Sequence, residues 1–190
     1  METERPLTPQ ESMEVIVRAI ARTKDDVRAN SFYFLLWGWL IALASFGFFV
    51  LSMYVDTRLY FLPFPVLAAV GFVATFVHYS KKKSKATESY LTFFLSRLWA
   101  ALGICFLLVV FINVTAGMMP FTYTLLLAGI GTLVSGWTMK FRPLIVGGEV
   151  FLAASLASVY VPMEYKSLLH GVAIVIGYLV PGYILKKAEG

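Results

Sequence analysis

Glu149 is the residue whose type and position most favour chemistry in this chain. It follows Gly147-Gly148 inside a long apolar stretch. An ionisable group within a membrane span is costly and usually faces protein or water, which makes it a candidate for function. Arg97 is the partner that we expect for it. Two hypotheses stay open: an ion pair or hydroxyl-capped carboxylate that fixes helix packing, and a proton- or cation-linked site.

The two histidines are the next candidates. His78 lies three residues before the lysine run that starts at Lys81, and His170 lies near the start of the last apolar stretch. The predicted topology places the two histidines near opposite faces of the membrane, most of a bilayer apart, so they cannot share a metal ion. His170 is a candidate outer pH-sensitive group beside Glu164 or Asp56, because histidine titrates near neutrality. The alternative is an ordinary histidine at the membrane interface.

Motifs for catalysis are absent from the sequence. It contains no paired-histidine metal motif, phosphate-binding loop, Gly-x-Ser-x-Gly turn or cluster of carboxylates suited to two-metal chemistry. The lone Cys105 cannot form an internal disulfide. We therefore expect a protein that is not an enzyme and that needs no cofactor or metal.

Composition points to a membrane as the surroundings of the chain. Of its residues, 59% are hydrophobic and 14% are charged, whereas soluble domains are about a quarter charged. The stretch from Leu98 to Met139 carries no formal charge over forty-two residues, enough for two crossings of a hydrocarbon core about 30 Å thick. Gly117 and Pro120 mark the turn between the crossings. The centre of the chain is therefore predicted to be a transmembrane hairpin.

Around this hairpin we expect an all-α polytopic membrane protein with six transmembrane helices in three hairpins. The expected spans are 32–54, 61–80, 92–114, 121–139, 144–162 and 168–185. With the N-terminus inside, fourteen of the sixteen Lys and Arg residues fall on the cytoplasmic side, and Arg58 and Lys166 fall outside. This bias obeys the positive-inside rule. We expect the cell inner (plasma) membrane, with both termini cytoplasmic.

Residues 1–30 form the expected cytoplasmic segment. Thr8-Pro9-Gln10-Glu11 predicts a helix start, with threonine as N-cap and proline at the first helical position. From about 9 to 30, apolar residues recur at helical spacing and charged residues follow one another on the opposite face. This amphipathic helix lies on the membrane surface or under the bundle, or it docks a partner or a second copy. Both hypotheses stay open.

Basic residues near the inner face suggest a contact surface. Lipid headgroups or a partner are the expected contacts, and a loop that only sets the topology is the alternative. The residues concerned are Lys81, Lys82, Lys83, Lys85, Arg18 and Arg22.

One pattern recurs within the bundle at 31–187. Residues 130–140 align without gaps to 176–186, a fainter copy starts at Val70-Gly71, and Leu36-Trp37 is matched by Leu98-Trp99. One hairpin used three times in the same orientation is the simplest explanation. The repeated glycines allow neighbouring helices to approach closely.

Three consecutive hairpins with glycine-rich ends of the type Gly-x-Leu-Val-Ser-Gly resemble the HdeD-like (acid-resistance) family of six-helix membrane proteins. The resemblance is clearest over residues 121–187, and the amphipathic N-terminal helix departs from it. The run Phe34-Leu35-Leu36-Trp37-Gly38-Trp39 is similar to small uncharacterised bacterial membrane proteins. Neither resemblance supplies catalytic residues.

The expected function is non-enzymatic: a regulatory, stress-related or scaffolding membrane protein that acts through its cytoplasmic helix and basic loops. The alternative is a small oligomeric transporter or channel with Glu149 and Arg97 on a polar path, and a membrane enzyme ranks third. The lipid bilayer is the expected partner, a homo-oligomer and a cytoplasmic protein are open alternatives, and no nucleic acid is expected. A solvent-filled interior around Glu149 favours transport, and a dry, tightly packed one favours the scaffold.

Overall fold

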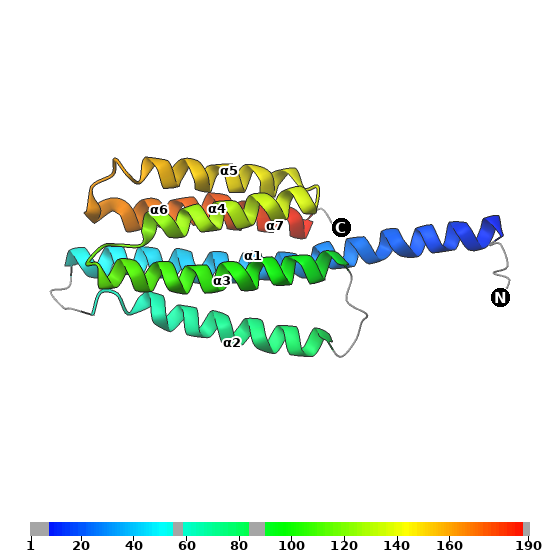
Figure 1. Cartoon of the computed structure of the whole chain (residues 1–190), viewed down its shortest axis with the longest axis horizontal. Helices are drawn as coiled ribbons and strands as arrows, with labels where there is room; N and C mark the ends of the chain where they lie inside the picture. The colour runs from blue at the N-terminus through cyan, green and yellow to red at the C-terminus, as the bar shows by residue number, and fades with distance from the viewer. Residues whose placement is uncertain (1–7, 55–58, 84–89, 188–190) are drawn as a thin grey trace.

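The computed structural model describes residues 8–54, 59–83 and 90–187; most side chains in 9–30, and those of residues 82 and 83, lie outside the description. The secondary structure of this part of the chain is helical throughout, in one bundle whose long helices run up and down (Figure 1). The elements are α1 (Pro9–Tyr54), α2 (Pro63–Lys83), α3 (Tyr90–Thr115), α4 (Phe121–Thr138), α5 (Arg142–Ala157), η1 (Met163–Tyr165), α6 (Lys166–Ile174), η2 (Val175–Leu179) and α7 (Val180–Lys187).

Helix α1 differs most from the sequence prediction. It begins at Pro9, as the capping pattern predicts, but it continues without a break for 46 residues to Tyr54. That is about 69 Å at 1.5 Å per residue. No glycine or proline stands between Pro9 and Gly38, so nothing interrupts the backbone hydrogen bonds where the span was expected to begin. The N-terminal part of α1 projects beyond the ends of the other helices (Figure 1).

Two short turns join α3 to α4 and α4 to α5, and both end the preceding helix in the same way. Gly117 has a φ of 70° and Lys140 has a φ of 51°. In each turn the next N–H donates to the carbonyl five residues earlier, at 2.8 and 2.9 Å. This is the Schellman helix end. The turn predicted at Gly117 is confirmed, and Lys140 adopts the same conformation without glycine.

Helices α4 and α5 form the most extensively packed pair in the bundle. A Cβ added at Gly148 would lie 2.6 Å from the backbone nitrogen of Leu133, and one added at Gly136 would lie 2.7 Å from the nitrogen of Ile145. The two backbones are therefore in contact, with no side chain between them at these points.

The structure shortens the fifth predicted span and divides the sixth. Helix α5 ends at Ala157 after 16 residues, where we expected it to reach 162. The last span contains α6, the π-helical turn η2 and α7. Pro181 carries no N–H to donate to the carbonyl of Gly177, four residues earlier, and the π turn lies at this point.

Four segments are long and apolar enough to cross a membrane: Ser31–Tyr54, Pro63–Lys81, Tyr90–Thr115 and Met163–Lys187. Helices α4 and α5 have 18 and 16 residues, about 27 and 24 Å, and are not among the four. The chain is therefore a helical protein with the build of a membrane protein.

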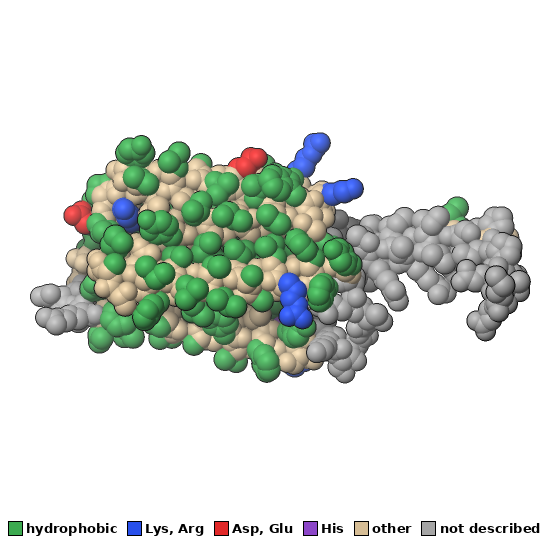
Figure 2. All heavy atoms as spheres, viewed as in Figure 1, with side chains coloured by type: hydrophobic (Ala, Val, Ile, Leu, Met, Phe, Trp, Pro, Cys, Tyr) green, Lys and Arg blue, Asp and Glu red, His purple; other side chains and the backbone are tan. Residues whose placement is uncertain are grey.

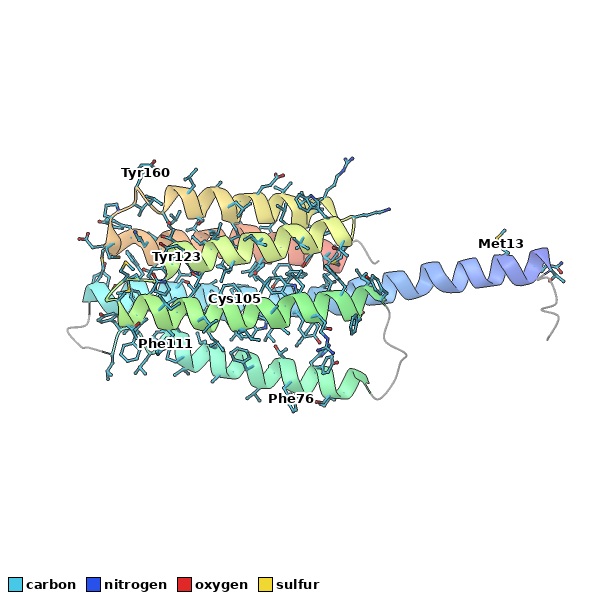
Figure 3. All side chains as sticks on the ribbon, viewed as in Figure 1. Met13, Phe76, Cys105, Phe111, Tyr123 and Tyr160 are labelled. Carbon is cyan, nitrogen blue, oxygen red and sulfur yellow. The ribbon has the colours of Figure 1, made fainter. Side chains whose placement is uncertain are left out.

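The outer surface of the bundle is also apolar, as a membrane protein requires. Phe76 is 71% exposed and Tyr160 is 84% exposed, and both point away from the bundle (Figure 3). On the face in Figure 2, hydrophobic side chains cover the sides, and most of the Lys and Arg side chains lie towards the end from which α1 projects. Such a surface is suited to lipid along the sides and to charged headgroups at the ends.

Helices α1 and α2 are joined by a tryptophan that lies over a glycine. The indole N–H of Trp37 donates to Thr75 Oγ1 at 3.1 Å. One turn earlier on α2, a Cβ added at Gly71 would lie 3.0 Å from the Trp37 ring and 3.0 Å from Leu40 Cδ1. The missing side chain at Gly71 allows the ring to reach the hydroxyl one turn further on.

Helices α3 and α4 make the same contact. The indole N–H of Trp99 donates to Ser135 Oγ at 3.1 Å. A Cβ added at Gly131 would lie 3.0 Å from the Trp99 ring and 2.5 Å from Leu102 Cδ1. The spacing from tryptophan to leucine and from glycine to hydroxyl is the same in both hairpins. We call this arrangement the Trp–Gly contact.

The third pair of helices contains a variant of this contact. A Cβ added at Gly177 would lie 2.5 Å from the ring of Phe151 on α5. Pro181 stands four residues after Gly177, where the other two hairpins have a hydroxyl. An aromatic ring therefore lies over a glycine in all three pairs, without the hydrogen bond in the last.

Candidate functional site

A buried histidine joins three helices inside the bundle. His170, on α6, is 4% exposed. Its Nδ1 lies 2.8 Å from Ser45 Oγ on α1, and its Nε2 lies 3.2 Å from Thr124 Oγ1 on α4. The rings of Phe64 and Phe121 flank the imidazole, with centroid distances of 6.3 and 5.4 Å. We call His170, Ser45 and Thr124 the histidine node.

The hydroxyl hydrogens of the node point at backbone carbonyls. Ser45 donates to the carbonyl of Ile41 at 2.7 Å, and Thr124 donates to that of Pro120 or Phe121 at 3.1 or 3.0 Å. In this arrangement each ring nitrogen faces a hydroxyl oxygen that can accept. A ring protonated on both nitrogens makes both hydrogen bonds, whereas a neutral ring requires one hydroxyl to rotate. The neutral and the doubly protonated ring therefore require different orientations of the two hydroxyls.

The interior position of His170 differs from the interfacial one that the sequence suggested. Glu164, its expected neighbour, is exposed on η1, and Asp56 lies outside the described residues. The imidazole is inside because Ser167, His170 and Ile174 follow one another at helical spacing on the buried face of α6.

A cluster of hydroxyls lies nearby, between the start of α4 and the end of α5. Ser155 Oγ donates to the carbonyl of Thr122 at 2.8 Å, and Ser158 Oγ lies 2.7 Å from both Thr122 Oγ1 and the carbonyl of Ser155. Ser167 is fully buried, and its Oγ has no hydrogen-bond partner among the described residues. Hydroxyls rather than charged groups thus connect the helices at this end.

Glu149 and Arg97 are not brought together. Both side chains are exposed, the first on α5 and the second on α3. Helix α4 packs against α3 and against α5 and lies between them (Figure 1). The Arg97 guanidinium lies 5.3 Å from the centroid of the Phe93 ring on its own helix. Glu149 faces outward because Gly147 and Gly148 occupy the buried face of α5.

The basic residues are described only in part. Lys81, at the end of α2, and Lys186, in the last turn of α7, are exposed. The ring of His78 stacks on Phe32 with centroids 4.0 Å apart. The remaining predicted contact residues lie outside the described side chains: Lys82, Lys83, Lys85, Arg18 and Arg22. Within the described residues, no three His, Cys, Asp or Glu side chains form a group able to hold a metal ion.

Sequence reasoning did not find the partners of His170. Ser45 and Thr124 are single hydroxyls in apolar helices, and Ser45 is 125 residues away along the chain. The available signal was the spacing of Ser167 and His170, which places two polar groups on one face of an apolar helix.

Comparisons with known proteins give no match. No family model matches the chain, and neither does any curated protein or solved structure. The fold and the buried polar groups therefore define the class directly: a helical protein with four segments able to cross a membrane.

Proposed function

We propose that this chain is a non-enzymatic integral membrane protein with a regulatory, stress-related or scaffolding role, in which a closely packed bundle holds a projecting helix for a cytoplasmic partner. The unbroken helix α1 carries the proposal. The 46 residues of α1 less the 24 of its span Ser31–Tyr54 leave 22 residues, 9–30, about 33 Å of helix. We call residues 9–30 the stalk.

The continuity of α1 favours docking over a position on the membrane surface. A helix on the surface must turn sharply away from the span that follows it, and a sharp turn needs a proline, a glycine or a break in the hydrogen bonds. Helix α1 has none of these between Pro9 and Gly38. The stalk therefore continues the direction of the span away from the bundle (Figure 1).

The proposal includes six spans in three hairpins, with both termini on the cytoplasmic side of the inner membrane. The C-terminal ends of α2 and α7 and the α4–α5 turn lie at the end of the bundle from which α1 projects, and the start of α6 lies at the other end (Figure 1). The first three carry Lys81, Lys186 and Lys140, and the start of α6 carries Lys166. That distribution agrees with the positive-inside rule. The Trp–Gly contact supports a repeated hairpin, and local thinning of the bilayer accommodates the shorter α4 and α5.

The packing of the interior favours a scaffold over the transport alternative. Backbones meet directly at Gly136 and Gly148, and Phe151, Leu125 and Leu144 are fully buried. Glu149 and Arg97, which a polar path would need to share, are exposed on helices separated by α4.

The histidine node supports a pH-sensitive element, which stays a proposal. Its hydrogen-bond and ring partners among the described residues are two hydroxyls and two phenylalanine rings, so a second proton on the ring introduces a charge where α1, α4 and α6 meet. A ¹⁵N NMR titration of the imidazole of His170, with His78→Gln used to assign the signal, tests it. If the ring stays neutral at every pH at which the protein is folded, His170 is not a pH-sensitive element.

Photo-crosslinking from the stalk in native membranes tests the main proposal. A photoreactive residue at Ile16 or Ile20, on the apolar stripe, is expected to give a defined crosslinked product. The matched positions Arg18 and Arg22, on the charged face, are expected to give less. Equal yields from both faces, in a protein whose bundle is folded, overturn the docking role.

A flux assay separates the scaffold from the transport alternative. Purified protein in proteoliposomes with a pH-sensitive dye inside is expected to show no ion flux. Flux in the wild type that disappears in Glu149→Gln would instead establish transport and make Glu149 its coupling residue.

A further inference from the structure

A groove runs along the contact between α1 and α2 at the end from which the stalk projects. Its volume is about 640 Å³, and its wall is apolar apart from one end. The lining residues are Phe32, Ala69, Val70, Val73, Ala74, Val77, His78 and Lys81. The polar end consists of Lys81 and of His78, whose ring stacks on Phe32. We call this the α1–α2 groove.

A second groove lies beside the first, across Phe32, and is likewise an apolar lining with one lysine. Its volume is about 360 Å³, and its lining residues are Ser31, Phe32, Leu35, Leu36, Trp39, Leu40 and Lys186. Phe32 belongs to both grooves, so the two flank one stretch of α1. Among the described residues, the lining of each groove contains one lysine and no carboxylate. We call this the α1–α7 groove.

The dimensions of the α1–α2 groove match one leaflet of a bilayer. From Ala69 to Lys81 the α-helix rises about 18 Å at 1.5 Å per residue, and half of a hydrocarbon core about 30 Å thick is about 15 Å. A chain of methylene groups can therefore lie along the alanine and valine side chains while Lys81 stands at the level of the phosphates. Basic residues at this level attract anionic lipids.

We propose that each groove binds one anionic phospholipid, with an acyl chain along the apolar wall and the phosphate at the lysine. The charge of the lining selects the headgroup, because a lysine with no carboxylate among the described lining residues favours an anionic over a zwitterionic lipid. The two lipids hold α1 where it leaves the bundle and becomes the stalk. The inference depends on the proposed topology in one respect, namely the leaflet from which the lipid comes.

Native mass spectrometry of the purified full chain tests the proposal. Phosphatidylglycerol and phosphatidylcholine with identical acyl chains are added separately. The wild type is expected to retain up to two phosphatidylglycerol molecules and to bind them more tightly than phosphatidylcholine. Lys81→Gln and Lys186→Gln are each expected to weaken one of the two binding events about fivefold, and the double variant is expected to lose the preference for phosphatidylglycerol.

Lys187→Gln is the matched control for charge alone. Lys187 is exposed and adjacent to Lys186, but it lines neither groove, so its variant is expected to bind as the wild type does. An equal loss in all three lysine variants means that net charge attracts the lipid, and it overturns the two sites.

Two further measurements separate the apolar wall from the phosphate. Ala74→Leu narrows the α1–α2 groove and keeps every charge. It is expected to weaken the binding of one phosphatidylglycerol molecule and to leave the binding of the other unchanged. Glycerol phosphate without acyl chains is expected to leave lipid retention unchanged. Displacement of the lipid by glycerol phosphate would indicate a free phosphate site and overturn the proposal.

A dimer that forms in place of lipid binding also overturns the proposal, because a second copy then covers the grooves. Crosslinking from the stalk is unaffected by these results, so the two proposals can fail separately.

Discussion

Gly148→Ala tests the closest approach of two helices in the bundle. The added methyl group would lie 2.6 Å from the backbone nitrogen of Leu133 and 2.8 Å from its Cα, whereas ordinary van der Waals contact begins at 3.4 Å. Backbone atoms cannot rotate away as the end of a flexible side chain can. Helices α4 and α5 must therefore separate along much of their shared face to admit one carbon.

The expected cost is large for a single methyl group. Overpacking costs about 1–3 kcal/mol, and we expect the upper half of that range because backbone rather than side chain is displaced. For a chain of this size, about 2–3 kcal/mol lowers the unfolding midpoint by roughly 5 °C or more. Thermal unfolding in detergent, followed by the circular dichroism of the helices, measures the change.

Two other glycines provide matched controls. A Cβ at Gly103 on α3 meets nothing within 4 Å, and one at Gly47 on α1 meets the Pro63 side chain at 3.4 Å. Gly103→Ala and Gly47→Ala should unfold at the wild-type temperature or slightly above it, since alanine favours the helix over glycine by about 1 kcal/mol. If Gly148→Ala unfolds at the same temperature as these two controls, the backbones of α4 and α5 are not in contact at Gly148.

The remaining predictions concern polar side chains and the surface. Trp99→Phe and Ser135→Ala should each cost about 0.6–1.7 kcal/mol, and a double-mutant cycle on unfolding should show that they act through one shared hydrogen bond; independent effects would contradict the Trp–Gly contact. Ser45→Ala should cost about 1–3 kcal/mol because it leaves Nδ1 of the buried His170 without its hydroxyl partner, while Nε2 keeps Thr124, whereas Ser52→Ala on the exposed end of α1 should stay within about 0.5 kcal/mol. Glu149→Gln should leave the unfolding midpoint unchanged because the carboxylate is exposed, and a loss of folded protein would show that it is a structural group. Cys105, exposed on the side of α3, should resist membrane-impermeant maleimide in intact membranes and react after solubilisation; labelling in intact membranes would place α3 outside the hydrocarbon core.

Turns and apolar runs were predictable because they depend on neighbouring residues. The turn after α3 followed from Gly117 and Pro120, and the start of α1 followed from Thr8-Pro9. The continuity of α1 was also present in the sequence, as the absence of a helix breaker before Gly38. The predicted division at residue 31 came instead from the change in hydrophobicity, which marks a membrane boundary and does not end a helix.

The pairing of polar groups could not be predicted in the same way. Glu149 and Arg97 were matched by their depth in the membrane, but the direction of each side chain depends on which face of its helix is buried. The glycines of α5 take the buried face, and Glu149 is left outside. Ser45 and Thr124 meet His170 only because α1, α4 and α6 converge, and no local pattern encodes that convergence.

The sequence by itself determined the helical class, the apolar segments and the glycines at which helices can meet, since helix formation and partition into lipid depend on residue type and local spacing. Only the tertiary structure decided that a tryptophan lies over a glycine in two successive hairpins, that His170 is enclosed by two hydroxyls, and that apolar grooves ending in lysine flank α1. Those features depend on the rotation and neighbours of each helix. An apolar side chain is as stable in lipid as against a neighbouring helix, so hydrophobicity alone does not choose between arrangements of the helices. The arrangement is selected by how closely side chains from distant parts of the chain pack together.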